Sequence, residues 1–558
     1  MKLLIKNGLV INVFTGEIEP QNILIEDGII LGTGDYDDAD ADVIHDVDGR
    51  YVCPGFIDGH IHIESTMLMP HELAKAAIAH GTTAIVADPH EIANVCGTDG
   101  LRFMLRASEG IPMTVYMMLP SCVPSTPFDE AGAVLEAEDL LSFYRYPRVL
   151  GLGAMMNYPA VLAEDERVLR KIRDAHQAGR TVNGHAPMLT GRDLDKYIAS
   201  GINDDHECST AEEAIERIRK GQWVMIREGT AARNLEALLP LFDPVYSHRC
   251  ILVTDDRHPA DLLHEGHIDS IIRKASEAGR SPVTGIQMAT IQAAQCFGLK
   301  GVGAIAPGYA ADILVLDSLN KVQISDVYYR GKKAAENGIV LPFEVPDIPK
   351  ALRDSVLGSF NMAVISPKNF EISHTGKTRV IGVLEGQLIT DELIMDVNGI
   401  DTERDILKLA VIERHKNTGH MGIGYIKGIG MKSGAIASSV SHDSHNLIVI
   451  GTNEKDMAKA ANRIREIGGG NVVVKDGRVL AEMPLPVAGL MSTLSAEEAA
   501  RQNAAVRKAV YDLGVPEGIE PFMNMAFVSL PVIPHLKMTT LGLVDVDKQE
   551  LAALSAGE

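Results

Sequence analysis

Eight short apolar runs, alternating with polar loops and helical patterns, divide the sequence between Gly55 and about residue 280. We interpret the runs as strands at 56–62, 82–88, 113–119, 148–156, 180–185, 200–206, 222–227 and 249–255. Helical patterns occur at 70–80, 164–179, 209–220 and 261–279, and at 164–179 apolar residues recur at spacings of three and four. Eight strand–helix units over this length predict an α/β fold with a (β/α)8 TIM-type barrel at residues 53–300.

The segments on either side of the barrel have β character. Residues 1–52 contain Asn7-Gly8 and Asp27-Gly28 between apolar runs, and both dipeptides are typical of hairpin turns. Residues 301–345 return to strand patterns. We expect the two segments to pair as one small β-sandwich domain, because the two ends of a domain often lie close together.

A further α+β domain is predicted at residues 355–558, after the proline-marked stretch 342–349. Its strands are expected at 380–384 and 446–450, with a helix at 455–467 and a hairpin at 472–480. One polar stretch, 441–446, contains His442 and His445. It is either an ordinary polar loop or a loop that lines the mouth of the barrel.

Composition excludes several classes of function. A net charge of −23 disfavours binding to nucleic acid, because phosphate backbones repel an acidic protein. No run of about 18 apolar residues is present that would cross a membrane. Six scattered cysteines without a Cys-x-x-Cys pair are typical of reduced thiols, so we expect a cytoplasmic protein.

The first barrel strand ends in His60 and His62, which are separated by one residue and so share a face of the strand. Other predicted strands end in further polar residues: Asp88 and His90, Ser121, Asn157, His185, His206, Arg227 and Glu228, and Asp255. Residues at the carboxyl ends of barrel strands converge at one rim, where barrel enzymes build their sites. Imidazoles and a carboxylate gathered in this way predict a site for a divalent ion such as Zn²⁺, Mn²⁺ or Fe²⁺.

Such an ion lowers the pKa of a water molecule toward neutrality and so supplies a nucleophile. Asp255, at the end of the last strand, could bind the ion, accept the proton of that water and deliver it to a leaving group. Hydrolysis of a C–N bond fits this arrangement, because the departing nitrogen must be protonated.

Several motifs resemble those of the bacterial adenine deaminase family in the amidohydrolase superfamily. They are 54–65, 88–92 (Asp-Pro-His-Glu-Ile), 225–229, 254–257, 264–269 and 440–446, in that order along nearly the whole chain. The resemblance implies hydrolytic deamination of adenine to hypoxanthine and ammonia, as in purine salvage. It also implies a binuclear site loaded with manganese or iron, zinc being possible, in a protein that forms a homo-oligomer, expected to be a dimer.

The resemblance assigns His60, His62 and Asp255 to one ion and His185 and His206 to the other. The family shares a glutamate between the ions, in a Gly-Leu-x-Glu-Met-Met stretch, but this sequence has Ala154 at the glutamate position. We therefore expect the second metal site to be weakened. Water, or one of the acids Glu64, Asp88 and Glu91, could substitute for the missing ligand.

An acid must also polarise the purine ring; the candidates are Asp88, Glu91 and Glu228, and Asp88 is our first choice. The other candidates for substrate contact or support of the ligands are His90, Glu64, Arg227, His442 and His445. Asp88 and His90 could instead cap a helix and support a ligand, and Arg227 and Glu228 could form a rim salt bridge. The alternative functions are another C–N hydrolase of the superfamily, such as a cyclic amidase, and an inactive metal-binding relic.

Overall fold

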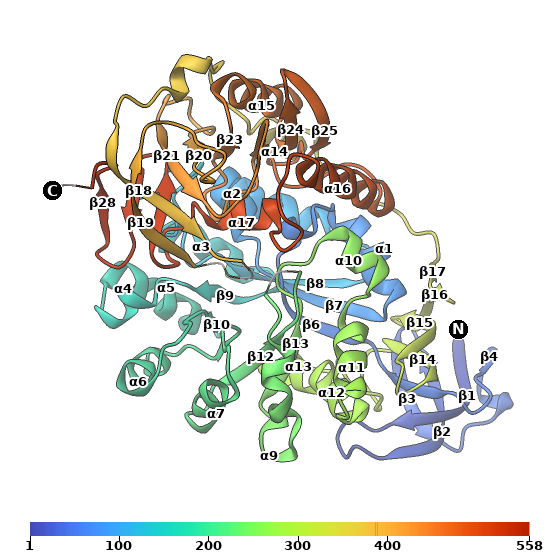
Figure 1. Cartoon of the computed structure of the whole chain (residues 1–558). Helices are drawn as coiled ribbons and strands as arrows, with labels where there is room; N and C mark the ends of the chain where they lie inside the picture. The colour runs from blue at the N-terminus through green and yellow to red at the C-terminus, as the bar shows by residue number, and fades with distance from the viewer. Residues whose placement is uncertain (231, 386, 388, 557–558) are drawn as a thin grey trace.

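The computed structural model describes residues 1–230, 232–385, 387 and 389–556. Eight parallel strands, β6 to β13, are arranged around one axis (Figure 1). The strands are β6 (Phe56–Ile61), β7 (Thr82–Ala87), β8 (Thr114–Leu119), β9 (Val149–Met155), β10 (Thr181–Gly184), β11 (Asp204–Asp205), β12 (Trp223–Arg227) and β13 (Cys250–Val253). β6 to β10 form one hydrogen-bonded sheet and β11 to β13 a second. A parallel bridge between Ile61 and Asp255 joins β13 to β6. The fold is therefore the TIM-type barrel that the alternating pattern predicts.

Helices follow every barrel strand. They include α1 (Pro70–Ala79), α2 (His90–Ala107), α3 (Ala137–Leu141), α5 (Glu166–Gln177), α6 (Gly191–Ala199), α7 (Ala211–Arg219), α8 (Leu235–Leu238) and α11 (Ile268–Glu277). The single helix predicted at 261–279 is wrong, because α10 (Pro259–His264) ends before α11 begins. Gly266 lies between them at φ +107°, a backbone conformation that a continuing helix cannot contain.

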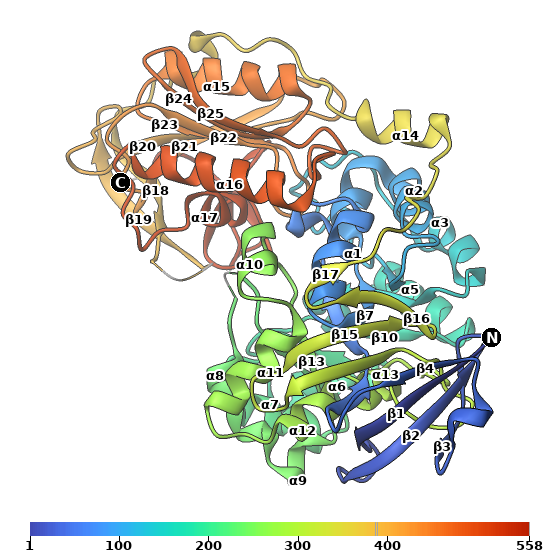
Figure 2. The same ribbon diagram turned by 90° about the vertical axis from the view of Figure 1, so that its right-hand side faces the viewer.

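Strands from both flanks of the barrel form one sheet (Figure 2). They are β1 (Lys2–Ile11), β2 (Ile18–Glu26), β3 (Ile29–Gly34), β4 (Val43–Asp46), β5 (Tyr51–Pro54), β14 (Ile313–Ser318), β15 (Gln323–Tyr329), β16 (Lys332–Glu336) and β17 (Ile339–Val340). The antiparallel pairing of β5 with β14 joins the two segments. Apolar side chains of both, such as Ile5 and Ile313, share one buried cluster.

The two predicted hairpin turns have different outcomes. Asp27-Gly28 connects β2 to β3 as expected. Asn7-Gly8 does not end a strand: β1 continues through it with a shift of register between Ile5 and Gly8. Asn7 has a positive φ of 59°, so the dipeptide forms a bulge that bends the strand instead of reversing it.

The C-terminal region contains an eight-stranded sheet that packs, with its helices, against one end of the barrel (Figure 1). Its strands are β18 (Gly376–Val383), β19 (Thr390–Val397), β20 (Leu407–Ile412), β21 (Met421–Lys427), β22 (Ala435–Ser438), β23 (Leu447–Gly451), β24 (Gly470–Lys475) and β25 (Arg478–Pro484). The helices are α14 (Lys350–Leu357), α15 (Glu454–Ile467), α16 (Ala496–Tyr511) and α17 (Pro521–Phe527), and a small sheet contains β26 (Leu536–Thr539), β27 (Gly542–Asp545) and β28 (Glu550–Ala552).

The expected helix and hairpin of this region are confirmed as α15 and as β24 with β25. α15 ends at Gly468, whose left-handed conformation (φ 76°) is the usual helix stop. α16 contacts α10, and α14 contacts α2, so the C-terminal region rests on the barrel rim. Among the described residues, no helix is both long and apolar enough to cross a membrane.

Candidate metal centre and active site

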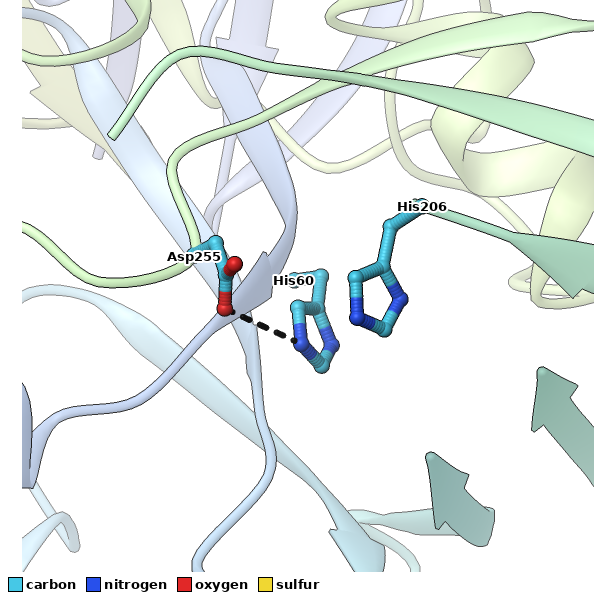
Figure 3. Close-up of side chains that lie close together, drawn as sticks. All are labelled: His60, His206 and Asp255. Carbon is cyan, nitrogen blue, oxygen red and sulfur yellow. Dashed lines mark ion pairs between the residues drawn. The ribbon is translucent and has the colours of Figure 1, made fainter. Parts of the chain in front are cut away.

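Closure of the barrel brings the first three predicted ligands together. His60 and His62 lie at the end of β6, and Asp255 follows β13. The backbone N–H of Asp255 donates to the carbonyl oxygen of His60 at 2.9 Å, which fixes the two chain segments side by side. Asp255 Oδ1 then lies 3.1 Å from His62 Nε2 and 3.6 Å from His60 Nε2. Figure 3 shows the carboxylate facing the His60 ring.

The remaining two predicted ligands adjoin this group. His185 follows β10 and His206 follows β11, and His185 Nδ1 lies 3.2 Å from His206 Nε2. The His206 ring stacks on the His60 ring with centroids 4.3 Å apart (Figure 3). Five side chains from four strand ends therefore gather at one mouth of the barrel.

The chemistry of this donor set fits a divalent cation. Both ring nitrogens of His60, and Nδ1 of His206, are buried without a hydrogen-bond partner among the described residues. A buried polar atom without a partner is costly unless something else satisfies it. His60, His206 and Asp255 offer one ligand atom each within 4.8 Å of one another, and imidazole with carboxylate is a usual ligand set for zinc, manganese or iron.

Arg227 links this group to a carboxylate that the sequence reasoning missed. Its Nη1 donates to Asp255 Oδ2 at 2.8 Å and to Glu207 Oε1 at 2.5 Å. Glu207 Oε1 also lies 3.3 Å from His206 Nε2. The only sequence signal for Glu207 is its position directly after His206. One role predicted for Arg227 is a rim salt bridge. Arg227 does form salt bridges, but with Asp255 and Glu207 inside the predicted metal site.

Charges around Asp255 keep it ionised. Burial alone would raise its pKa, but the Arg227 guanidinium and the neighbouring imidazoles hold the pKa well below the usual range. Burial beside His60 and His185 lowers the pKa of His206 well below its ordinary value. A neutral imidazole and an ionised carboxylate are the forms that bind metal ions.

A second buried cluster joins the barrel to the C-terminal region. Glu91, in the first turn of α2, accepts a hydrogen bond from His445 Nε2, and its Oε1 forms an ion pair with His442 Nδ1 at 2.8 Å and lies 3.3 Å from His90 Nε2. Burial opposes ionisation of Glu91, but the three imidazoles hold its pKa well below the ordinary value. Burial likewise opposes the charge on His442, yet Glu91 raises its pKa to about 9. The stretch 441–446 therefore lines the barrel mouth.

The other predicted acids have separate surroundings. Asp88 Oδ2 accepts the backbone N–H of Ala154 at 3.1 Å, next to the position where the resemblance places a glutamate. Glu64 Oε1 accepts the N–H of Ile92 at 3.2 Å, and burial raises its pKa to about 7. Glu228 pairs with Lys274 at 3.0 Å, as the salt-bridge alternative proposed.

A cavity of about 450 Å³ lies at the barrel mouth, between the predicted metal ligands and the C-terminal region. Its polar lining includes His62, His90, Glu91, His185, His206, Glu207, Arg227, Asp255, Asp256, His442 and Asp443. Its apolar lining includes Ala154, Met156, Phe527, Leu530, Val532 and Ile533. Phe527 stacks on His442 with centroids 4.5 Å apart, so the C-terminal region supplies much of the apolar wall. Asp88, Glu64, Glu228 and His445 are not among the lining residues.

Comparison with known proteins agrees with this arrangement. Residues 51–341 match the amidohydrolase family, and residues 387–550 match the adenine deaminase C-terminal domain. Adenine deaminase 2 of Carboxydothermus hydrogenoformans is 47% identical over 99% of this chain and 97% of its own length. The chain belongs to the adenine deaminase family.

A second adenine deaminase, from Desulfatibacillum aliphaticivorans, is 44% identical over 98% of this chain and 95% of its own length. Among solved structures, dihydropyrimidinase from Brevibacillus agri has a TM-score of 0.50 at 16% identity, and covers 62% of this chain and 97% of its own. That likeness supports the amidohydrolase fold alone. The match to the C-terminal domain distinguishes adenine deaminases from such barrel relatives, and it includes Phe527 and His442 of the cavity wall.

Proposed function

We propose that this protein hydrolyses adenine to hypoxanthine and ammonia. The observation that carries the proposal is the union of an amidohydrolase barrel, with its cluster of histidines and carboxylates, with a C-terminal adenine deaminase domain that lines the same cavity. A divalent ion held by His60, His62 and Asp255, with a second held at His185 and His206, would activate water as the nucleophile. Manganese or iron as that ion, a dimeric assembly and a cytoplasmic location remain predictions.

Asp255 is the proposed proton carrier. Its Oδ2 is bound by Arg227 and its Oδ1 faces the histidines, so the carboxylate is oriented by contacts on both oxygens. In the ionised form it accepts the proton of the attacking water. It then delivers that proton toward the amino group at C6, which leaves as ammonia. Water adds one oxygen and two hydrogens, so hypoxanthine and ammonia balance the reaction.

The cavity wall suits a flat aromatic base. Phe527, Leu530 and Val532 offer apolar contact, whereas Glu91 and His442 provide a charged pair in the same lining. Glu91 lines the cavity and Asp88 does not, which favours Glu91 with His442 over Asp88 for polarising the purine ring. In this pair His442 carries the proton at neutral pH and can donate it toward a ring nitrogen.

The test of the proposal is ammonia release from adenine by the full-length protein supplied with Mn²⁺, with hypoxanthine identified as the other product. Hydantoin and dihydroorotate, assayed for ring opening, represent the cyclic amidase alternative. Turnover of a cyclic amide without turnover of adenine would contradict the proposal. Turnover of neither substrate would favour the metal-binding relic.

The Glu91–His442 pair predicts a pH dependence. Because the pKa of His442 is raised to about 9, its protonated form is present below that pH and is lost above it. We therefore expect kcat/KM for adenine to fall as pH rises through about 9. In Glu91→Gln the carboxylate charge is absent, so the fall in kcat/KM should begin at lower pH, and kcat should fall by about 10²-fold. The pH profiles of wild type and variant measure both effects. If kcat/KM of Glu91→Gln falls at the same pH as that of wild type, the Glu91–His442 pair does not take part in the proposed mechanism.

A further inference from the structure

A carboxylate lies beside the second pair of histidines, although the strand end that should supply one carries Ala154. Glu207 Oε1 is 3.4 Å from His185 Nδ1 and 3.3 Å from His206 Nε2, and the two nitrogens are 3.2 Å apart. We propose that Glu207 is the carboxylate ligand of the second metal ion in this chain and substitutes for the missing glutamate. The inference rests on the proposed binuclear hydrolase.

The spacing of the three atoms suits a single ion. Ligand atoms about 2.1 Å from one ion lie about 3.4 Å apart in tetrahedral geometry and about 3.0 Å apart in octahedral geometry. The three measured separations lie within that interval. His185, His206 and Glu207 accordingly form one of the ligand groups that could hold a metal ion.

The other candidate substitutes are engaged elsewhere. Asp88 accepts the N–H of Ala154, Glu64 accepts the N–H of Ile92, and Glu91 is bound by His442 and His445. In the part of the chain that the structure describes, none of these three acids shares a possible metal group with His185. Glu207 does so without any movement of the backbone.

Charge balance also supports Glu207 as a ligand of the second ion. Two cations close together need anionic ligands, and replacing a glutamate by Ala154 removes one negative charge from the centre. Glu207 restores that charge at the cavity wall. Arg227 holds both of its oxygens, with Nη1–Oε1 at 2.5 Å and Nη2–Oε2 at 3.1 Å, and so fixes the direction in which the carboxylate points.

Metal binding to the full-length apoprotein tests the proposal directly. Mn²⁺ titration followed by electron paramagnetic resonance, together with elemental analysis after dialysis, should give two ions per wild-type chain, in place of the weakened second site that Ala154 alone predicts. In Glu207→Gln the first ion should bind as in wild type, whereas the second should bind about 100-fold more weakly or be lost on dialysis. Two equally tight ions in Glu207→Gln, or one ion in wild type, would overturn the proposal.

Two further variants separate ligation from indirect effects. Arg227→Gln removes the same ion pair and the orientation that it gives, but keeps the Glu207 carboxylate, so it should weaken binding of the second ion less than Glu207→Gln does. A loss equal to that of Glu207→Gln would overturn the proposal, because Glu207 would then act through Arg227. Adding Ala154→Glu to Glu207→Gln should restore two metal ions per chain. That result would show that the Glu207→Gln chain is still folded around its histidines. Ammonia release from adenine is assayed separately, so inactivity with two ions bound would contradict the proposed function and not the role of Glu207.

Discussion

Replacing Asp255 by asparagine is expected to lower kcat for ammonia release from adenine by about 10³-fold. Asparagine keeps the shape of the side chain but cannot accept and return a proton. It also removes the negative charge that faces His60, His62 and Arg227. Steady-state assays at saturating Mn²⁺ measure the effect on the chemical step, and metal analysis of the same sample shows whether an ion was lost as well.

Asp261→Asn is a matched control, because Asp261 lies on the same side of the barrel but contacts Thr230 and does not line the cavity. We expect its activity to stay within about twofold of wild type, since surface substitutions away from the site have small effects. An Asp255→Asn variant that retains both its metal and its full rate would remove Asp255 from proton transfer.

Removal of divalent metal is expected to abolish turnover and to destabilise the protein. The nitrogens of His60 are buried without partners among the described residues, so the apoprotein leaves costly polar groups unsatisfied. Free metal at about 100 times its Kd would stabilise the folded state by about 2.7 kcal/mol. Dialysis against a chelator should therefore lower Tm as well as activity, and added Mn²⁺ or Fe²⁺ should restore both.

Differential scanning calorimetry with and without metal measures the shift in Tm. His374→Gln is a suitable comparison, because that histidine is half-buried, contacts the carbonyl oxygen of Lys377 and does not line the cavity, so its variant should show the same shift as wild type. A chelated protein that keeps both its Tm and its turnover of adenine would refute the assignment of this centre to a metal.

The barrel and the meeting of the five predicted ligands could be predicted from sequence because both follow from local rules. A strand of alternating faces sets the direction of His60 and His62, and the closed barrel brings distant strand ends to one rim. Glu207 and the Glu91–His442 pair follow no such rule. Their roles depend on the rotamers of side chains after the strands and on how the C-terminal region rests on the barrel, neither of which has a periodic signal.

Two predicted elements are wrong: the hairpin turn at Asn7-Gly8 and the single helix at 261–279. Asn7-Gly8 has the composition of a hairpin turn, and only the pairing of β1 with β2 on both sides of it shows that it is a bulge. The helix expected at 261–279 is interrupted at Gly266, which has a positive φ. At Asn7-Gly8, strand pairing selects between two structures that the local sequence allows, whereas Gly266 itself separates the two helices.

The pairing of β5 with β14 joins Cys53 to Leu314, residues that are separated by the whole barrel. Loop closure over such a distance is entropically unfavourable until the intervening chain is compact. During synthesis, β1 to β5 therefore leave the ribosome with an unpaired edge that is completed only after residue 314 has been translated. Until then the nascent chain carries an exposed strand that chaperones or other nascent chains can reach.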